Sequence, residues 1–568
     1  MLNRRNFLEF SSISALLFVS GIPSSSQADE PLKMGDSEPF SFDLLVQRAK
    51  EAASQPYIVP STLSAEVLAK LDYDAHGKIR FKPEYALFAE GPGQFPITFF
   101  HPGKFFPKLV RLYVVDKGAA KEILYDQAYF DMPEDSPARQ LTQGVGFAGF
   151  RFQESRTGDQ QKLDWRNNDW TAFLGAAYFR AIGELYQYGL SARGIALDVA
   201  QPERAEEFPD FTHFWFESPD SNTSDSVVVY ALLYGPSICG AYRFAIQRGK
   251  GVVMEVEAAL FMRGEVQRFG IAPISSMYWF SEQTKKTAAD WRPEVHDSDG
   301  LAIWTGAGER IWRPLNNPPR TMASAFSDNN PRGFGLLQRD REFSHYLDGV
   351  HYERRPSLWV EPLGDWGKGA VQLVEIPTDD EIHDNIVAMW VPEKPAGPGT
   401  DYRLRYRLHW LADEPCPGEL AHCVATRFGN GGRPGQTRPQ GVRKFVIELS
   451  GDLTKSLEVH ILNVQASPID YSLYLAPDMI DGVKAGLTNE GKRVLDDAIA
   501  LLTAAGVPFQ AHVELGNVAE QVEAEVQRLG CDAVVMGTRG LGNFGGLLLG
   551  SVATRVIHEV SVPVTLIK

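Results

Sequence analysis

Two acidic motifs, each running into a strand-like segment that ends in tryptophan, carry the residue types that cleave sugars. Asp297 and Asp299 stand in HDSDGLAIW, which ends at Trp304, and Asp384 stands in IHDNIVAMW, which ends at Trp390. Glycoside hydrolysis needs one carboxylic acid to protonate the leaving oxygen and a second carboxylate to activate water. A carboxyl group desolvated beside an aromatic ring gains the raised pKa that a general acid needs. The motifs therefore predict a sugar-cleaving site.

A further motif, RRPSLWVEP, has the residue types that bind a sugar. Arg354, Arg355 and Glu361 offer charge-assisted hydrogen bonds to hydroxyl groups. Trp359 offers an aromatic face on which a pyranose ring can stack. We expect these four residues, together with Asp299, to bind the substrate.

Each acidic motif also has a purely structural interpretation. Asp-Ser-Asp-Gly is an ordinary turn sequence, in which aspartate side chains accept hydrogen bonds from backbone N–H groups. Asp384 beside Asn385 has the same ambiguity, and a single histidine such as His296 or His383 is more often structural than catalytic. Taken alone, these residues favour the turn over catalysis.

The elements that would hold the motifs are mainly short strands. Up to about residue 450, β-rich runs such as SVVVYALLYG and DYRLRYRLHWLA alternate with turn residues, and all eleven tryptophans lie between Trp165 and Trp410. This spacing predicts a large antiparallel β-sandwich. Residues 42–54 and 170–184 are expected to form amphipathic helices. The Pro- and Gly-rich residues 393–401 predict a linker to a smaller β module.

After Leu453 the pattern changes to alternating strands and helices. The alternation predicts an α/β unit with a parallel sheet. The expected strands are residues 457–464, 509–515 and 532–537, and the expected helices are residues 490–506 and 518–530.

The N-terminus has the layout of an export signal. Arg4 and Arg5 precede an apolar stretch at residues 13–19 and a small-x-small cleavage site that ends at Ala28. The paired arginines resemble a twin-arginine signal, which carries folded proteins across the inner membrane. We expect residues 1–28 to be removed and the mature chain to lie in the periplasm. The alternative is a basic start followed by a disordered tail.

Charge and motif content argue against several classes of partner. The net charge of −16 argues against nucleic acid and anionic membranes, which need clustered Lys and Arg. The N-terminal apolar run is far shorter than the roughly 20 residues that span a bilayer, so no stable membrane anchor is expected. No zinc-finger spacing or Walker motif occurs, and no metal or cofactor is expected. Cys416 and Cys423 could pair in an oxidising compartment, which their spacing alone leaves open.

Several long motifs resemble one family of proteins from residue 29 to residue 453. They include LDYDAHGKIRFKPEYALF, EEFPDFTHFWFE, RPLNNPPR, SDNNPRGFGLLQRDREFSHYLD and CVATRFGNGG. The family is that of the periplasmic glucans biosynthesis proteins G and D, and the twin-arginine start points to the D type. The resemblance implies a carbohydrate-active, galactose-mutarotase-like β-sandwich over residues 29–392 and a truncated immunoglobulin-like module over residues 393–453.

The same resemblance implies a function. The family acts on osmoregulated periplasmic glucans, whose backbone is β-1,2-linked glucose, and its members look like inverting endo-β-1,2-glucanases. Carried over by motif, Asp384 resembles the general acid, Asp297 the general base, and Tyr352 a member of the proton relay that joins this base to the nucleophilic water. A homodimer is compatible with this interpretation. The alternative is a non-catalytic glucan-binding or assembly protein, although paired acids favour catalysis.

The C-terminal residues 456–568 resemble a universal stress protein. The spacing Gly537-x2-Gly540-x9-Gly550-Ser551 matches that family's ATP-phosphate motif, in which glycines let the backbone approach phosphate and a helix N-terminus favours an anion. The family's first strand and helix, which hold the adenine, have no counterpart here. We therefore interpret the tail as a fragment fused in frame, with a vestigial nucleotide site. A selected nucleotide sensor is the alternative.

Overall fold

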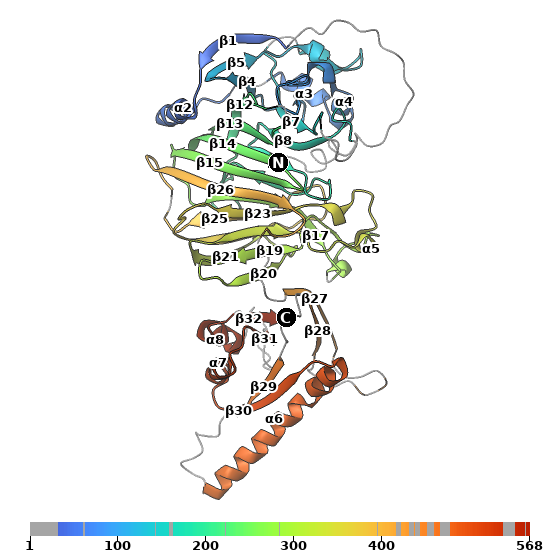
Figure 1. Cartoon of the computed structure of the whole chain (residues 1–568), viewed down its shortest axis with the longest axis vertical. Helices are drawn as coiled ribbons and strands as arrows, with labels where there is room; N and C mark the ends of the chain where they lie inside the picture. The colour runs from blue at the N-terminus through green and yellow to red at the C-terminus, as the bar shows by residue number, and fades with distance from the viewer. Residues whose placement is uncertain are drawn as a thin grey trace. The chain divides into compact units, whose positions relative to one another are not determined.

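The computed structural model divides into two compact units, Met1–Pro415 and Cys416–Lys568. The residues that it describes are 32–567 apart from 61–62, 142–143, 158–162, 222, 283, 395, 416–421, 431–434, 436, 438–442, 451–458, 466–476, 538–550 and 563. Among these residues, no helix is long and apolar enough to cross a lipid bilayer. The N-terminal unit is built from two large sheets (Figure 1).

The larger sheet of the N-terminal unit has twelve strands. All neighbouring strands are antiparallel except β4 and β12, which pair in parallel. In spatial order they are β1 (Met34–Pro39), β5 (Ala119–Ile123), β4 (Arg111–Asp116), β12 (Asp210–Glu217), β13 (Ser226–Tyr234), β14 (Ile238–Arg248), β15 (Val252–Met262), β26 (Asp401–Leu411), β23 (Ser357–Pro362), β22 (Gly333–Leu337), β19 (Gly300–Trp304) and β20 (Arg310–Pro314).

The second sheet of this unit has ten strands and packs against the first. In spatial order they are β21 (Met322–Asn329), β24 (Lys368–Glu375), β25 (Ile386–Pro392), β16 (Phe269–Ser276), β10 (Ser191–Arg193), β9 (Tyr178–Ala181), β8 (Asp169–Leu174), β7 (Gly149–Gln153) and β3 (Ile97–Phe100), with β11 (Ala196–Leu197) also paired to β16. Two short pairs lie outside both sheets, β17 (Tyr278–Phe280) with β18 (Val295–His296) and β2 (Arg80–Phe81) with β6 (Phe130–Asp131). The antiparallel β-sandwich expected from the sequence is therefore confirmed.

One continuous apolar core fills the space between the two sheets. It is rich in phenylalanine: the ring of Phe150 on β7 packs against Phe173 on β8 and against Phe214 and Phe216 on β12, with ring centres 4.6–5.1 Å apart. Since successive strand residues point to opposite faces, one set of side chains on each strand enters this core and the other set faces outward. That alternation decides which residues can meet at a site.

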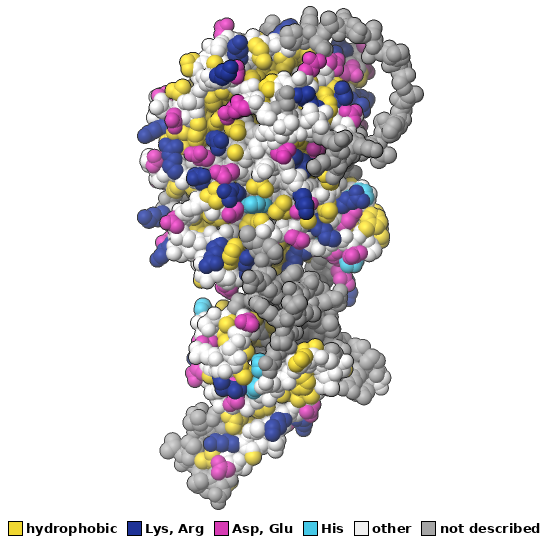
Figure 2. Space-filling view, viewed as in Figure 1, with side chains coloured by type: hydrophobic (Ala, Val, Ile, Leu, Met, Phe, Trp, Pro, Cys, Tyr) yellow, Lys and Arg dark blue, Asp and Glu magenta, His cyan; other side chains and the backbone are white. Residues whose placement is uncertain are grey.

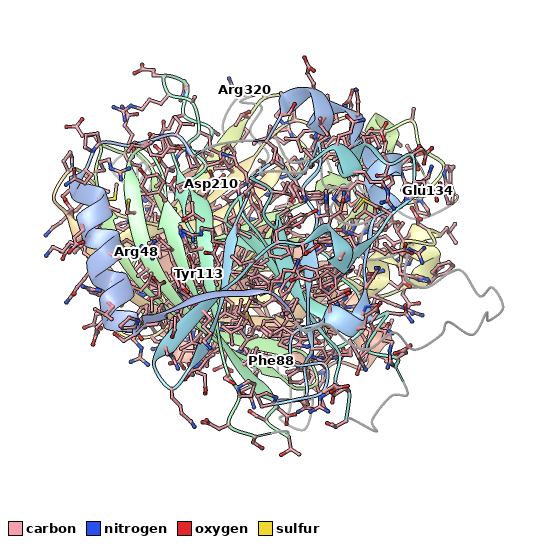
Figure 3. All side chains as sticks on the ribbon, turned by 90° about the horizontal axis from the view of Figure 1, so that it is seen from above. Arg48, Phe88, Tyr113, Glu134, Asp210 and Arg320 are labelled. Atoms are coloured by element: carbon pink, nitrogen blue, oxygen red, sulfur yellow. The ribbon has the colours of Figure 1, made fainter. Side chains whose placement is uncertain are left out.

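A single long helix covers part of the outer face of the twelve-stranded sheet. Helix α2 (Phe42–Ser54) begins at Ser41, whose hydroxyl accepts a hydrogen bond from the backbone N–H of Leu44. Its buried residues Leu45 and Ala49 pack on an aromatic cluster that includes Tyr113. Figure 3 shows this helix, marked by Arg48, at the side of the sheet that carries Tyr113. The helix expected over residues 42–54 is confirmed.

The shorter helical segments of this unit lie in its connections. They are α3 (Ala65–Lys70), α4 (Tyr73–Gly77), α5 (Phe343–Tyr346) and the 3₁₀ turns η2 (Pro83–Tyr85), η3 (Gln127–Tyr129), η4 (Pro137–Gln140), η5 (Lys285–Thr287) and η6 (Tyr352–Arg354).

The helix expected over residues 170–184 is wrong. This segment forms the adjacent strands β8 and β9, joined by a turn in which Ala177 has a φ of 57°. Both faces of these strands are largely buried, so polar residues do not alternate with apolar ones as they do in a half-exposed strand. A continuous apolar run of this kind cannot be told from a buried helix by its periodicity.

The boundary expected at residue 393 is also misplaced. Residues 401–411 form β26, which is hydrogen-bonded between β15 and β23 in the interior of the twelve-stranded sheet. The proline-rich segment before it is a loop that leads from one sheet of the sandwich to the other. In the second unit, β27 (His422–Asn430) and β28 (Arg443–Ser450) form an antiparallel hairpin, which is a two-stranded sheet of its own.

The rest of the C-terminal unit alternates strands and helices, as expected. Strands β29 and β30 pair in parallel, and so do β31 and β32, but among the described residues the two pairs are separate sheets. The elements are β29 (Val459–Gln465), α6 (Pro477–Ala505), β30 (Phe509–Leu515), α7 (Val518–Leu529), β31 (Val534–Gly537), α8 (Ser551–Glu559) and β32 (Val564–Ile567). The loss of a central strand would leave a sheet split in this way.

Two buried histidines of the N-terminal unit give a pH prediction. Burial lowers the pKa of His76 and of His101 to about 4. In the unfolded chain both imidazoles titrate near pH 6.5. Between those values the unfolded state binds more protons, so the free energy of unfolding must fall as the pH is lowered from about 6.5 to about 4, by about 1.4 kcal/mol per pKa unit for each group.

We therefore expect the melting temperature to drop steeply over this interval. In His76→Phe the decline should be shallower, because one of the histidines whose pKa is lowered by burial is gone. His383→Phe, which changes an exposed histidine, is the control and should keep the wild-type slope. An identical pH dependence in wild type and His76→Phe would contradict the assignment.

Candidate active site

Asp297 and Arg355 form a buried ion pair where the chain enters β19 and β23. The Asp297 carboxylate oxygen lies 2.5 Å from Arg355 Nη1, and the two side chains are 0% and 4% exposed. The backbone N–H of Asp297 donates to the carbonyl of Met277 at 2.8 Å, which fixes the start of the turn. A carboxylate taken this far out of water needs such a partner if it is to stay charged.

Asp384 lies on the loop that leads into β25, and its neighbour holds this loop in place. The Asn385 side chain accepts from the backbone N–H of Tyr278 at 2.8 Å and donates to the carbonyls of Tyr278 and Ile376, each at 2.9 Å. The asparagine of the Asp-Asn pair therefore has the structural role. It leaves Asp384, which is partly exposed, at the surface of the site.

The charge of Asp384 acts on three buried arginines. Burial lowers the pKa of Arg180 to about 9, and the charge of Asp384 is among those that oppose this. Burial also lowers the pKa of Arg355, again against the charge of Asp384. In Arg193 burial alone would lower the pKa, but neighbouring anionic groups, Asp384 among them, raise it. The partly exposed carboxylate thus lies in a strongly basic environment.

Each of these guanidinium groups lies over a tyrosine ring, a geometry that favours a desolvated cation. The distances from guanidinium carbon to ring centre are 4.4 Å for Arg180 on Tyr188, 4.8 Å for Arg193 on Tyr178 and 4.3 Å for Arg355 on Tyr352. Arg193 is fixed further by Ser275 and Glu206, each at 2.6 Å. The arginines are therefore preorganised donors rather than mobile surface charges.

Tyr352 belongs to a second network next to Asp384. Its hydroxyl donates to Glu381, and Glu381 also accepts from Arg292 Nη1 at 2.7 Å. The same Nη1 donates to Asp348 at 2.6 Å. Since Glu381 is three residues before Asp384, this network ties Tyr352 to the loop of the candidate acid.

Asp299 has the structural role that the turn interpretation predicts. Its carboxylate accepts from the backbone N–H groups of Arg339 and Asp340, the second at 2.9 Å. His296, which precedes Asp297, donates through Nε2 to the Glu294 carboxylate at 2.9 Å. Within HDSD, then, the first aspartate is paired with arginine and the second anchors a neighbouring loop.

Two of the expected sugar-binding residues lie on a different face of the sandwich. On β23, Leu358 and Val360 enter the core, so Trp359 and Glu361 face outward from the twelve-stranded sheet. Trp359 packs with Trp304 and Trp312, and Glu361 contacts His409 at 2.9 Å. On β9 the core residue is Phe179, so Tyr178 and Arg180 face outward from the other sheet. The structure therefore does not group Trp359 and Glu361 with Asp384, and Arg354 is exposed with Glu353 3.6 Å away.

The structure adds residues that the motifs did not single out. Arg180 and Arg193 had one signal in the sequence, an arginine inside a largely apolar segment. Arg292 and Glu381 had none, because only the fold brings them together. The donor atoms of Glu294, Asp340 and His345 lie within 4.8 Å of one another, close enough to share a cation, and His345 already contacts Asp340 at 2.6 Å.

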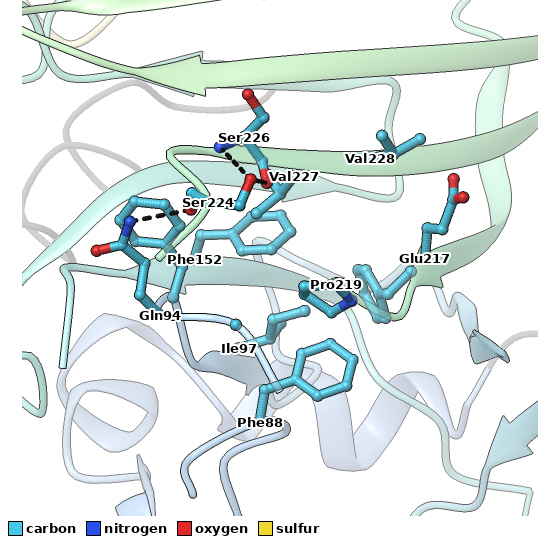
Figure 4. Close-up of a pocket in the computed structure, with 13 residues that line it drawn as sticks. Phe88, Gln94, Ile97, Phe152, Glu217, Pro219, Ser224, Ser226, Val227 and Val228 are labelled. Carbon is cyan, nitrogen blue, oxygen red and sulfur yellow. Dashed lines mark hydrogen bonds between the residues drawn. The ribbon is translucent and has the colours of Figure 1, made fainter. Parts of the chain in front are cut away.

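The small pocket shown in Figure 4 is not part of this acid and arginine cluster. It lies beside Phe88 and Phe152, and its volume of about 10 Å³ is that of one water molecule. Of the nucleotide motif in the tail, Gly537 ends β31 and Ser551 begins α8. Gly540 and Gly550 lie outside the described residues, as do residues 1–31 and Cys416.

Comparison with known proteins assigns the N-terminal unit. Residues 40–473 match the family described as "Periplasmic glucan biosynthesis protein, MdoG". Glucans biosynthesis protein D 2 of Ralstonia nicotianae is 70% identical over 451 residues, which cover 79% of this chain and 84% of that protein. The chain belongs to the MdoG family. Glucans biosynthesis protein D of Xanthomonas axonopodis pv. citri is 46% identical over 458 residues, with the same coverage of both chains.

The C-terminal unit matches a second family. Residues 445–568 match the universal stress protein family, so the two matches overlap at residues 445–473. A solved structure of hypothetical protein MJ0577 is 26% identical and covers 20% of this chain and 78% of that one, with a TM-score of 0.18. This MdoG-family chain therefore carries a universal-stress-protein segment behind its glucan biosynthesis region, and both resemblances seen in the sequence are confirmed.

Proposed function

We propose that this MdoG-family protein cleaves the linear β-1,2-glucan backbone of osmoregulated periplasmic glucans as an inverting endo-glucanase. The proposal rests on the different environments of two aspartates. Asp384 is partly exposed among preorganised arginines, whereas Asp297 is fully buried and paired with Arg355. In inverting hydrolysis one carboxyl group meets the leaving oxygen and the other, farther away, activates water.

Asp384 is the proposed general acid, because it alone of the two reaches solvent and hence a bound sugar. Asp297 is the proposed general base. A fully buried carboxylate cannot touch the nucleophilic water, so its proton must arrive through intervening groups. We propose Tyr352 as one of them, because its ring lies against Arg355, the partner of Asp297. The three buried arginines place positive charge around Asp384 without themselves reaching the substrate. No cofactor enters this chemistry.

The proposed location is the periplasm, reached by a twin-arginine signal at residues 1–28. The universal-stress-protein segment is proposed to be dispensable for glucan cleavage. Its phosphate-binding motif is kept, but the strand and helix that would form the adenine side of the site are not. The two separate parallel strand pairs in this unit support that view.

The proposed activity is tested on linear β-1,2-glucan. We expect the mature protein, and a version that ends at residue 453, to shorten the polymer into oligosaccharides, as measured by product sizing. Proton NMR of the first products should show inversion at the anomeric carbon. Linear β-1,3-glucan is the control and should stay intact. Binding without shortening would instead support the non-catalytic assembly role.

A further inference from the structure

The residue next to Arg292 is a tryptophan that the fold leaves in solvent. Trp291 is 70% exposed, whereas Arg292 is 7% exposed. Most tryptophans of this unit are buried or half-buried in the sheets, as expected for the largest apolar side chain. An indole left this open is not part of the core.

Arg292 fixes the loop that carries this tryptophan. The backbone N–H, Nε and Nη2 of Arg292 all donate to Asp290, at 2.8–2.9 Å. Its Nη1 donates to Asp348 and Glu381, from two other loops. The buried guanidinium of Arg292 thus hydrogen-bonds to residues of three loops. These bonds hold the backbone that carries Trp291 in place.

One of these three loops leads to the proposed acid. Glu381 is three residues before Asp384 and accepts a hydrogen bond from Tyr352. The indole therefore has a fixed position relative to the proposed acid. A side chain that binds a distant glucose unit of the same glucan chain must have a fixed position relative to the acid. Otherwise its contact would not align the scissile bond.

Further apolar side chains are exposed on the loop that Arg292 holds through Asp348. Phe343, Leu347 and Val350 are 49%, 45% and 39% exposed. Figure 2 shows apolar side chains gathered where Figure 1 places α5, with acidic, basic and histidine side chains around them. A ring of polar groups around an apolar surface matches a pyranose, which presents C–H faces and hydroxyl edges.

We propose that Trp291 is a sugar-stacking platform that binds a glucose unit of the glucan chain outside the point of cleavage. The assignment rests on the proposed function, because it takes the glucan as the occupant. The neutral indole face matches the uncharged ring, and the pinned loop fixes the distance to Asp384. Stacking on Trp291 stabilises the bound substrate and the transition state equally. It therefore lowers KM and leaves kcat unchanged.

The test compares Trp291→Ala with Trp291→Phe in the full-length protein. On long linear β-1,2-glucan, Trp291→Ala should raise KM about tenfold with kcat within about twofold, and Trp291→Phe should recover most of the loss. Isothermal titration with glucan should give the same ratio in Kd, and titration should change the fluorescence of the wild type. Ile58→Ala, which removes an apolar side chain that is 74% exposed, is the matched control and should behave as wild type.

The outcomes separate this proposal from the proposed function. If the wild type binds glucan without cleaving it and Trp291→Ala weakens binding, the stacking role of Trp291 is supported and the glucanase activity is contradicted. If the wild type cleaves glucan and Trp291→Ala has an unchanged KM and Kd, the platform is overturned. A lower molar mass in light scattering for Trp291→Ala, with unchanged glucan affinity, would assign this surface to a second copy of the chain and overturn it as well. A wild type that does not bind glucan overturns both.

Discussion

Asp384→Asn should lower kcat on β-1,2-glucan by about 100- to 10,000-fold, the range that general acid catalysis contributes. The substitution keeps the shape of the side chain but removes the proton that the leaving oxygen needs. Folding should be preserved, because Asp384 is partly exposed and its loop is held by the side chain of Asn385. KM and glucan affinity should change little, since the proton is required only in the transition state.

Asp379→Asn is the matched control for this variant. It makes the same change of charge in the same loop, at an exposed position, and should leave turnover near the wild-type value. The measurement is the initial rate of reducing-end formation, with thermal unfolding as the check on folding. Turnover within about threefold of wild type in Asp384→Asn would remove this residue from the mechanism.

The sequence could predict the candidate acids but not their surroundings. HDSD and HDN offered Asp297, Asp299 and Asp384 as candidates, and only the family resemblance gave catalytic roles to Asp297 and Asp384. The arginines come from β9, β10 and the start of β23, and only the packing of the two sheets brings them together. Trp359 shows the opposite error: it is four residues from Arg355 in the chain, yet it faces outward from the twelve-stranded sheet and packs with Trp304 and Trp312.

The domain boundary failed for a related reason. Residues 393–401 have the composition of a linker, but a loop that crosses from one sheet of a sandwich to the other has the same composition. Only the pairing of β26 with β15 and β23 distinguishes the two cases. The tail was easier to predict, since each of its strands and helices has its own local pattern of apolar residues.

Breaking the buried ion pair between Asp297 and Arg355 should lower both the stability of the protein and its turnover of glucan. Arg355→Met keeps the length of the side chain but removes its charge, which leaves the Asp297 carboxylate in a desolvated position. Breaking a buried pair in this way typically costs about 3–5 kcal/mol of unfolding free energy. Turnover should be lost as well, because Asp297 would become protonated and could no longer act as a base.

The double variant Asp297→Leu with Arg355→Met separates these two effects. Replacing both charges by apolar groups removes the desolvation cost, so much of the lost stability should return while activity stays absent. Urea unfolding of wild type, both single variants and the double variant gives the coupling energy, and glucan cleavage is measured on the same samples. If the double variant were as unstable as the sum of the single variants, the two side chains would not be coupled. If it kept wild-type turnover, Asp297 could not be the base, and the role would pass to another carboxylate.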